Sequence, residues 1–245
     1  MKATAVQQLS LLELASVDAE LARVAHRAGH LPAQAQLEDV VTRHREANDR
    51  LAVLGIAIED LDGEVAKQEA EVDGVRQRED RDRNLLSSGI TDAKQQADLQ
   101  HELETLERRQ SNLEDALLEL MERREQLQGE QAAQLVHIDD VHGELSRAQE
   151  ALDDAKVELE QAKHRAVSRR DQLTAGLDPE LLALYERLRA KGGAGAGLLQ
   201  ARRCGACRIE IDKGELARIA AAPEDDVLRC PECGAILLRT RESGL

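Results

Sequence analysis

The stretch LQHELETLERRQSNLEDALLELMERREQLQ, residues 99–128, decides the fold of this chain. Its leucines recur at steps of four and three residues, and charged or polar side chains fill most of the positions between them. Such spacing forms a narrow apolar stripe along a helix, which is typical of a coiled-coil seam rather than of the broader face of a globular helix. The stretch therefore predicts a long helix that packs against another helix.

The same stepping continues on both sides of this stretch. From Leu99 to Ala166, sixteen of twenty seam positions are apolar, and an earlier run from Leu37 to Val75 has ten apolar residues among twelve. Before that run, GHLP provides a helix break near 29–32, because glycine suits a helix end and proline suits the first turn of the next helix. The seams thus predict two long helices preceded by a shorter one.

The two seams are separated by NLLSSGITDAK at 84–94, where Thr91 or Asp92 can cap the following helix. A short connection between helices favours antiparallel neighbours. We therefore expect a mainly α fold, in which residues 1–175 form a long antiparallel coiled-coil hairpin with its tip near 84–91.

Polar residues within the seams bear on the register of the hairpin. If the tip is centred near residue 87 or 88, the numbers of facing residues sum to about 175, which places His44 opposite Gln131 and Gln68 near Gln110. Paired polar layers can fix register at some cost in stability. The alternative is that these residues occupy edges that a narrow seam tolerates.

The composition excludes several classes of protein. The chain has no Trp or Phe and one Tyr, and a third of its residues are charged. Its net charge is −15, but residues 186–245 hold 11 basic and 9 acidic residues, which leaves 22 basic and 39 acidic residues upstream. So acidic a coiled coil repels the phosphate backbone.

The sequence has no signal-peptide core and no apolar run long enough to span a membrane. We therefore expect a cytoplasmic protein that has no membrane partner and keeps its cysteines reduced or metal-bound.

Four cysteines near the C-terminal end carry the chemistry. They form the motifs CGAC and CPEC, with 22 residues between the two pairs. The four residues are Cys204, Cys207, Cys230 and Cys233. Two such pairs supply four thiolates for one tetrahedral Zn²⁺, and a site filled by four protein ligands is structural rather than catalytic. A redox pair would more naturally be single and lie near a βαβ pattern, and disulfides are not expected in a reducing compartment.

The remaining segments complete the domain organisation. Residues 176–199 read as a connecting helix, capped by Asp178, and a glycine-rich linker; residues 200–245 read as a small β-rich zinc ribbon. Within the ribbon we expect Gly205 and Gly234 in tight knuckles around the cysteines. The expected elements are a strand-like start after Cys207, a helical turn at Leu216–Ile219, and strands at 227–229 and 235–239.

Three segments together resemble a bacterial family of coiled-coil hairpin proteins with a C-terminal C4-type zinc ribbon. They are LLELASVDAELARVAHRAGHLP at 11–32, SSGITDAKQQADLQHELETLERRQSNLEDALLELME at 87–122, and the CGAC and CPECGAILLR motifs. The resemblance implies a non-enzymatic adaptor, associated in flagellated or secretion-competent bacteria with flagellar or type III secretion substrates, with an alternative sigma factor, and in one case with messenger RNA. It carries over the four cysteines as zinc ligands. Ala235 and Leu238 stand where family members often have Arg and Tyr.

Two functions follow for this chain, and neither involves catalytic residues or a small-molecule substrate. The first is a zinc-binding adaptor or chaperone-like scaffold, as a monomer or weak homodimer, that binds protein partners through the coiled coil and the ribbon. The alternative is a regulatory ribbon that binds RNA or DNA, although the chain lacks aromatic side chains for base stacking. Candidate contact residues for either partner are Arg202, Arg203, Arg208, Arg239 and Arg241.

Overall fold

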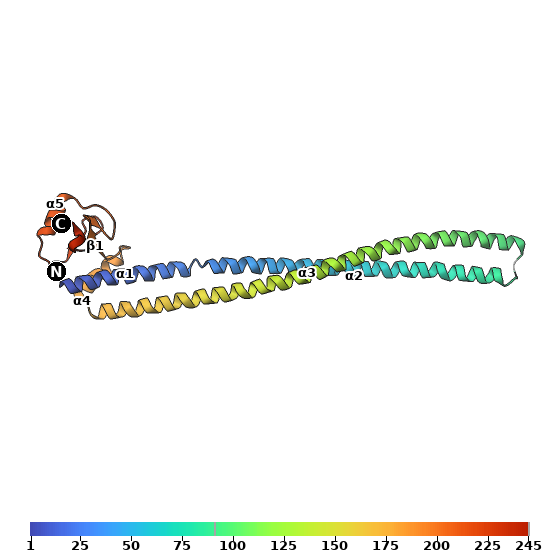
Figure 1. Ribbon diagram of the computed structural model, residues 1–245, viewed down its shortest axis with the longest axis horizontal. Coiled ribbons are helices and arrows are strands. Elements are labelled where there is room, and N and C mark those ends of the chain that lie inside the picture. Colours follow the sequence, from blue (N-terminus) through green and yellow to red (C-terminus); the bar gives the residue numbers. More distant parts are fainter. Residues whose placement is uncertain (91, 245) are drawn as a thin grey trace. The chain divides into compact units, whose positions relative to one another are not determined.

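The computed structural model describes residues 1–90 and 92–244. These residues form a mainly α protein with a small strand region near the C-terminal end, which confirms the expected fold class (Figure 1). The elements in chain order are α1 (Ala5–Ala28), α2 (Pro32–Ser87), α3 (Ala93–Ala175), α4 (Pro179–Arg189), β1 (Ala196–Gln200), β2 (Arg203–Cys204), α5 (Lys213–Ala221), β3 (Leu228–Arg229), β4 (Ile236–Leu238) and a 3₁₀ turn, η1 (Arg241–Ser243).

The predicted helix boundaries are confirmed where the structure describes them. Gly29 follows the last residue of α1, and Pro32 begins α2. At the tip, the Asp92 carboxylate accepts a hydrogen bond from the backbone N–H of Gln95 at 2.8 Å, so Asp92 caps α3. The other candidate cap, Thr91, lies outside the described residues.

The chain divides into two compact units, which we call the hairpin unit and the head unit. The hairpin unit is Ala35–Glu150, and the head unit is Met1–Gln34 together with Ala151–Leu245. The head unit therefore combines the first helix with the C-terminal ribbon, although most of the chain separates them in sequence.

In the hairpin unit, α2 and α3 run side by side in opposite directions (Figure 1). Their buried aliphatic residues are those of the predicted seams, because a stripe with an average period of 3.5 residues faces the partner helix. These residues are Val40, Ala47, Leu54, Val65, Val72, Val75, Leu106, Leu127 and Val141.

The predicted register is wrong. The Gln68 side chain donates to the backbone oxygen of Leu113 at 3.1 Å, about one turn along α3 from Gln110. The ring of His44 lies 5.9 Å from that of His142, whereas the Gln131 amide lies against Gly55. The connection after Ser87 adds residues before α3 begins, and helical side chains lean toward the N-terminus of their own helix. Both effects raise the residue numbers that meet across an antiparallel pair.

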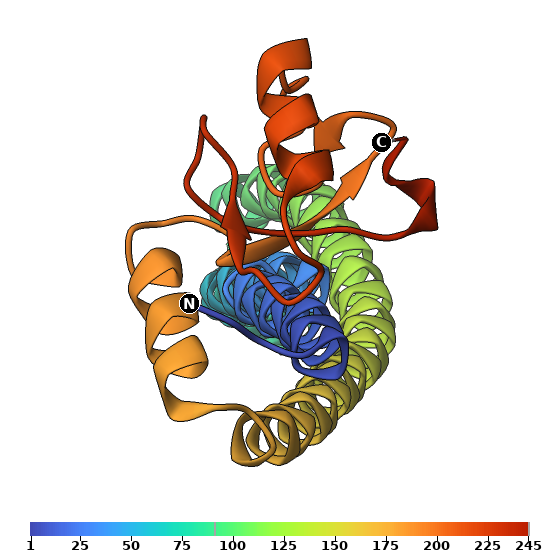
Figure 2. The same cartoon turned by 90° about the vertical axis from the view of Figure 1, so that its left-hand side faces the viewer.

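In the head unit, a four-stranded sheet has the order β2-β1-β4-β3, with β1 and β4 parallel and the other pairs antiparallel. Side chains alternate between its two faces, as the two-residue period of a strand requires. Leu199 and Leu237 pack toward α5 and the cysteines, whereas Ile236 and Leu238 pack toward α1 and α4. Figure 2 shows α5 and the first turns of α1 on either side of the sheet.

Two parts of the ribbon differ from the expected elements. The sheet already begins at Ala196, within the segment read as a linker, and the expected strand after Cys207 is reduced to a single bridge between Arg203 and Glu210. The helical turn expected at Leu216–Ile219 is the longer α5.

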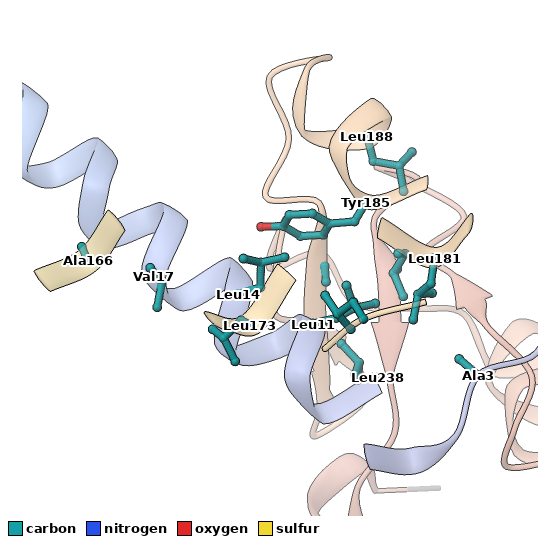
Figure 3. Close-up of a cluster of buried hydrophobic side chains, with 13 residues drawn as sticks. Ala3, Leu11, Leu14, Val17, Ala166, Leu173, Leu181, Tyr185, Leu188 and Leu238 are labelled. Carbon is teal, nitrogen blue, oxygen red and sulfur yellow. The ribbon is translucent and has the colours of Figure 1, made fainter. Parts of the chain in front are cut away.

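The main core of the head unit surrounds the single tyrosine of the chain. The ring of Tyr185 is fully buried with Leu11, Leu14 and Leu181, and Figure 3 shows these side chains gathered between α1 and α4. Gly195 has φ +72°, and a Cβ at this position would lie 2.4 Å from Cε2 of the tyrosine. A glycine is therefore required where the loop after α4 crosses the ring.

Candidate metal centre

The four cysteines of the ribbon come together at one point. The Sγ atoms of Cys204 and Cys233 are 3.9 Å apart, as are those of Cys207 and Cys230, and all four lie within 4.8 Å of one another. Four sulfurs at about 2.3 Å from a tetrahedral zinc ion are about 3.8 Å from each other, whereas a disulfide bond is about 2.05 Å long. The donor set therefore fits a metal ion with four thiolate ligands and not a pair of disulfides.

The two knuckles that carry the cysteines have the same backbone design. The N–H of Arg208 donates to the oxygen of Cys204 at 2.7 Å, and the N–H of Gly234 donates to the oxygen of Cys230 at 2.9 Å. Both donors follow the first cysteine of their pair by four residues, and both have positive φ, 64° for Arg208 and 73° for Gly234. Gly234 therefore serves the knuckle as predicted, and the corresponding residue of the first knuckle is an arginine.

Gly205 has a different role from the predicted one. Its φ is not positive, but a Cβ at this position would lie 2.7 Å from the backbone oxygen of Leu198. Its N–H donates to the same oxygen at 2.8 Å. Gly205 thus allows the first knuckle to approach β1 closely, which the sequence motif alone did not reveal.

The cysteine thiols differ in burial. Cys204 and Cys230 are buried, whereas Cys233 is exposed at the surface of the ribbon. Burial raises the pKa of the Cys204 thiol to about 12, and the backbone N–H of Ile209 lowers the pKa of Cys207. Because a metal ion binds thiolates, its binding would release the protons that burial retains.

The N-terminal segment is attached to the ribbon, an arrangement that the sequence did not predict. The N–H of Ala3 donates to the oxygen of Asp225 at 2.8 Å, and the Lys2 ammonium pairs with the Asp225 carboxylate at 2.8 Å. The Gln8 side chain donates to the backbone oxygens of Ala3 and Glu224. The first residues of the chain therefore extend the folded head unit beyond the zinc ribbon.

A buried carboxylate joins three helices of the head unit. Asp18 accepts a hydrogen bond from the Tyr185 hydroxyl at 2.7 Å and from Nε of Arg170 at 2.8 Å, and Nη1 of Arg189 lies 3.3 Å away. Burial, and then the hydrogen bond to Asp18, raise the pKa of Tyr185 well above its usual range. In the sequence, this cluster could have been suspected from Asp18, an acidic residue at a position of the apolar stripe of α1, and from the presence of one tyrosine in the chain.

The five candidate arginines fall into two groups. The Arg239 guanidinium donates to the backbone oxygens of Ile219 and Ala222, at 2.8 and 2.7 Å, and to that of Pro223, so it closes the C-terminal end of α5. Arg203 pairs with Glu210 at 3.7 Å. The exposed guanidinium groups of the other three make no hydrogen bond or ion pair with the described part of the chain: Arg202, Arg208 and Arg241.

None of the described helices is both long and apolar enough to cross a membrane. Outside the four cysteines, no group of three or more histidine, cysteine, aspartate or glutamate side chains converges on a metal-sized point among the residues described.

Comparisons with known proteins agree with this architecture. Residues 14–193 match the CT398-like coiled coil hairpin domain, and residues 203–237 match a C4-type zinc ribbon domain. A protein of Mycobacterium tuberculosis strain H37Rv is 63% identical over 98% of each chain, and a protein of Mycobacterium leprae is 48% identical over 92% of this chain and 97% of its own.

Solved structures show the same arrangement of elements. One from Mycobacterium smegmatis is 59% identical, covers 98% of this chain and 100% of its own, and has a TM-score of 0.81. The structure of CT398 from Chlamydia trachomatis has a TM-score of 0.64 over 96% of this chain and 98% of its own, and at 17% identity it is alike in fold alone. The expected resemblance is thus confirmed, and the chain belongs to the family of CT398-like coiled-coil hairpin proteins that carry a C4-type zinc ribbon.

Proposed function

We propose that this protein is a non-enzymatic adaptor in which one structural Zn²⁺ holds the ribbon together and the hairpin binds protein partners. The observation that carries the proposal is a set of exposed aliphatic side chains outside the seam of the hairpin unit. Val53 and Ile56 of α2 are 65% and 61% exposed, and Leu118 and Met121 of α3 are 57% and 37% exposed. Each pair is three residues apart and so lies on one helix face.

Such pairs are the anchors with which helices recognise one another. A seam already satisfied by α2 and α3 does not need them, and an amphipathic partner helix would bury them by the same three- and four-residue spacing. Apolar side chains that cluster on an otherwise charged surface commonly mark a protein–protein contact.

The zinc ion supports the adaptor indirectly. The four sulfurs leave no ligand position for water or substrate, so the ion would stabilise the ribbon and not perform chemistry. The ribbon has one small cluster of buried residues of its own and no aromatic side chain. Small domains of this kind commonly depend on a metal to fold.

Metal analysis of the natively purified protein tests the ion. We expect one zinc ion per chain, lost when Cys204 and Cys230 are replaced by serine. Chelation should unfold residues 200–245, as measured by amide hydrogen exchange, while leaving most of the helical circular dichroism. A native protein without bound metal would contradict this part of the proposal.

Crosslinking and affinity purification from the native host test the adaptor role. We expect protein partners whose recovery falls when Val53 and Ile56 are both replaced by Glu. Lys67→Glu is the matched control, because it changes the net charge equally on an exposed position of the same helix. Equal recovery by all three proteins would contradict binding through this face.

The nucleic-acid alternative has weaker support. Arg203 and Arg239 are engaged inside the ribbon, and the one tyrosine is buried, so base stacking has no exposed aromatic platform. Crosslinked RNA or DNA recovered in place of protein would favour this alternative.

A further inference from the structure

The backbone in and just before the first knuckle is strained at one alanine and two arginines. Among the described residues, three that are not glycine have positive φ: Ala201 at 47°, Arg202 at 64° and Arg208 at 64°. This region is unfavourable for side chains with a Cβ atom and is usually occupied by Gly or Asn. At the position equivalent to Arg208, the second knuckle has Gly234 with nearly the same φ, so glycine would satisfy the same backbone.

The other two strained residues, Ala201 and Arg202, form the tight turn between β1 and β2. Gln200 pairs with Arg203, so Ala201 and Arg202 are the two central residues of a hairpin turn in which both φ values are positive. Such turns favour Asn-Gly. Here the strain is supported by η1, since the N–H groups of Ala201 and Arg202 donate to the backbone oxygens of Glu242 and Ser243 at 3.2 and 3.1 Å.

No contact within the described chain explains the two arginine side chains. Arg203 and Arg239 engage a carboxylate and three backbone oxygens, respectively, whereas the guanidinium groups of Arg202 and Arg208 are exposed and have no partner among the described residues. Residues that persist in strained conformations tend to cluster at functional sites. The backbone thus keeps both arginines in an unfavourable conformation although their guanidinium groups have no partner within the described chain.

The geometry of the knuckle sets the spacing of the backbone positions that carry the two arginines. Cys204 N–H donates to the oxygen of Ile209 at 3.0 Å, and Ile211 N–H donates to the oxygen of Arg202 at 3.0 Å. The backbone of Arg202 therefore lies at one end of this short ladder and that of Arg208 at the other, three positions along it, which corresponds to about 10 Å between the two backbone positions at about 3.3 Å per residue. Between them, Ile209 is 48% exposed.

We propose that Arg202, Arg208 and Ile209 bind a short acidic segment of a partner protein. Each guanidinium would hold one carboxylate through paired hydrogen bonds, and Ile209 would contact an aliphatic side chain between the two acids. A segment in the polyproline II conformation, with three residues per turn and a rise of about 3.1 Å per residue, presents carboxylates three positions apart on one face and spans the spacing. This inference rests on the proposed adaptor function and names a second contact, on the ribbon.

Three observations favour a carboxylate partner over a nucleic acid. Residues 200–245 hold eight basic and eight acidic residues, so the ribbon lacks the excess charge with which proteins bind a phosphate backbone. The described ribbon presents no aromatic side chain for stacking. An exposed isoleucine between the arginines complements an aliphatic side chain, which a peptide supplies and a nucleic acid does not.

Peptide display on the full-length, zinc-loaded protein tests the chemistry of the partner. Random dodecapeptides selected by the wild-type protein are expected to contain two acidic residues three positions apart around aliphatic residues. The Arg202→Gly/Arg208→Gly variant is expected to lose this selection. Selection of peptides without acids, or of the same peptides by the variant, would overturn the proposal.

Fluorescence anisotropy at physiological ionic strength gives the quantitative test. The probes are an octapeptide with two aspartates three positions apart around Leu-Val, the matching asparagine octapeptide, and a single-stranded RNA of mixed sequence. We expect the aspartate peptide to bind about tenfold more tightly than either other probe, and the double glycine variant to lose about tenfold in affinity for it. Arg203→Gln, which alters an arginine that already has an internal partner, should change the affinity less than about twofold.

The same variant separates a binding defect from a folding defect. Glycine relieves the positive-φ strain, so the double variant should melt at a higher temperature than the wild type while binding the peptide less well. Tighter binding of RNA than of the aspartate peptide would overturn the proposal, as would unchanged peptide affinity or a lower melting temperature of the variant. If any of these results is obtained but partners are still captured through Val53 and Ile56, the adaptor function stands without the proposed contact at Arg202, Arg208 and Ile209.

Discussion

Replacing Asp18 by asparagine tests the buried cluster that joins α1, α3 and α4. The carboxylate is 4% exposed and has Tyr185, Arg170 and Arg189 as partners. Removing one partner of a buried ion pair costs about 3–5 kcal/mol. Because the side chains of Arg170 and Arg189 are 24% and 37% exposed, solvent screening reduces the expected loss of unfolding free energy to about 2–3 kcal/mol.

Urea denaturation followed by tyrosine fluorescence measures this loss in the head unit alone. Tyr185 is the one tyrosine and the chain has no Trp or Phe, so the signal reports on the core around α4. Helical circular dichroism would instead be dominated by the long helices α2 and α3.

Glu13→Gln is a matched control on the same helix. Glu13 pairs with Arg169, one residue before Arg170, but both side chains are about half exposed, at 47% and 48%. Its replacement should therefore cost less than about 1 kcal/mol. If Asp18→Asn costs no more than Glu13→Gln, the Asp18 cluster does not stabilise the head unit and our account of it is wrong.

Three further predictions concern the head unit, and the last has a control in the hairpin unit. Burial and the hydrogen bond to Asp18 raise the pKa of Tyr185. The stabilisation from its neutral hydroxyl should therefore be complete below pH about 10, the pKa of an unfolded tyrosine, and lost as the pH rises through the folded pKa. Absorbance at alkaline pH should show that Tyr185 ionises at higher pH in native buffer than in urea, and Tyr185→Phe should remove this pH dependence of stability. Arg239→Ala removes three hydrogen bonds to carbonyl oxygens at the end of α5 and should lower stability by about 2–3 kcal/mol in urea denaturation; an unchanged midpoint would show that α5 does not need this closure. Gly195→Ala places a methyl group 2.4 Å from the Tyr185 ring at φ +72° and should cost about 2 kcal/mol or more, whereas Gly74→Ala in α2, with nothing within 4 Å of the new methyl group, should stabilise the helix by up to about 1 kcal/mol in thermal denaturation.

The metal centre could be predicted from the sequence because its information is local. Two cysteines separated by two residues define each knuckle, and two such knuckles are enough to indicate four sulfurs around one ion. The sequence could not show which of the nearby arginines are paired within the chain or which have a strained backbone. Arg203 and Arg239 have internal partners that depend on where Glu210 and the end of α5 lie in space, and the strain at Arg208 appears only when its φ is known.

The sequence by itself determined the coiled-coil seams, the helix ends and the cysteine ligand set, since each depends on residues within a few turns of one another. Only the tertiary structure decided the register, the burial of Asp18 against Tyr185, and the joining of Lys2 and Gln8 to the ribbon. These contacts connect distant segments, so they depend on the length of the connection at the tip, on the direction in which side chains lean, and on the packing of α1 against the sheet. Hydrophobic periodicity specifies that a helix has a partner, but the position of each side chain along that partner is a property of the assembled fold.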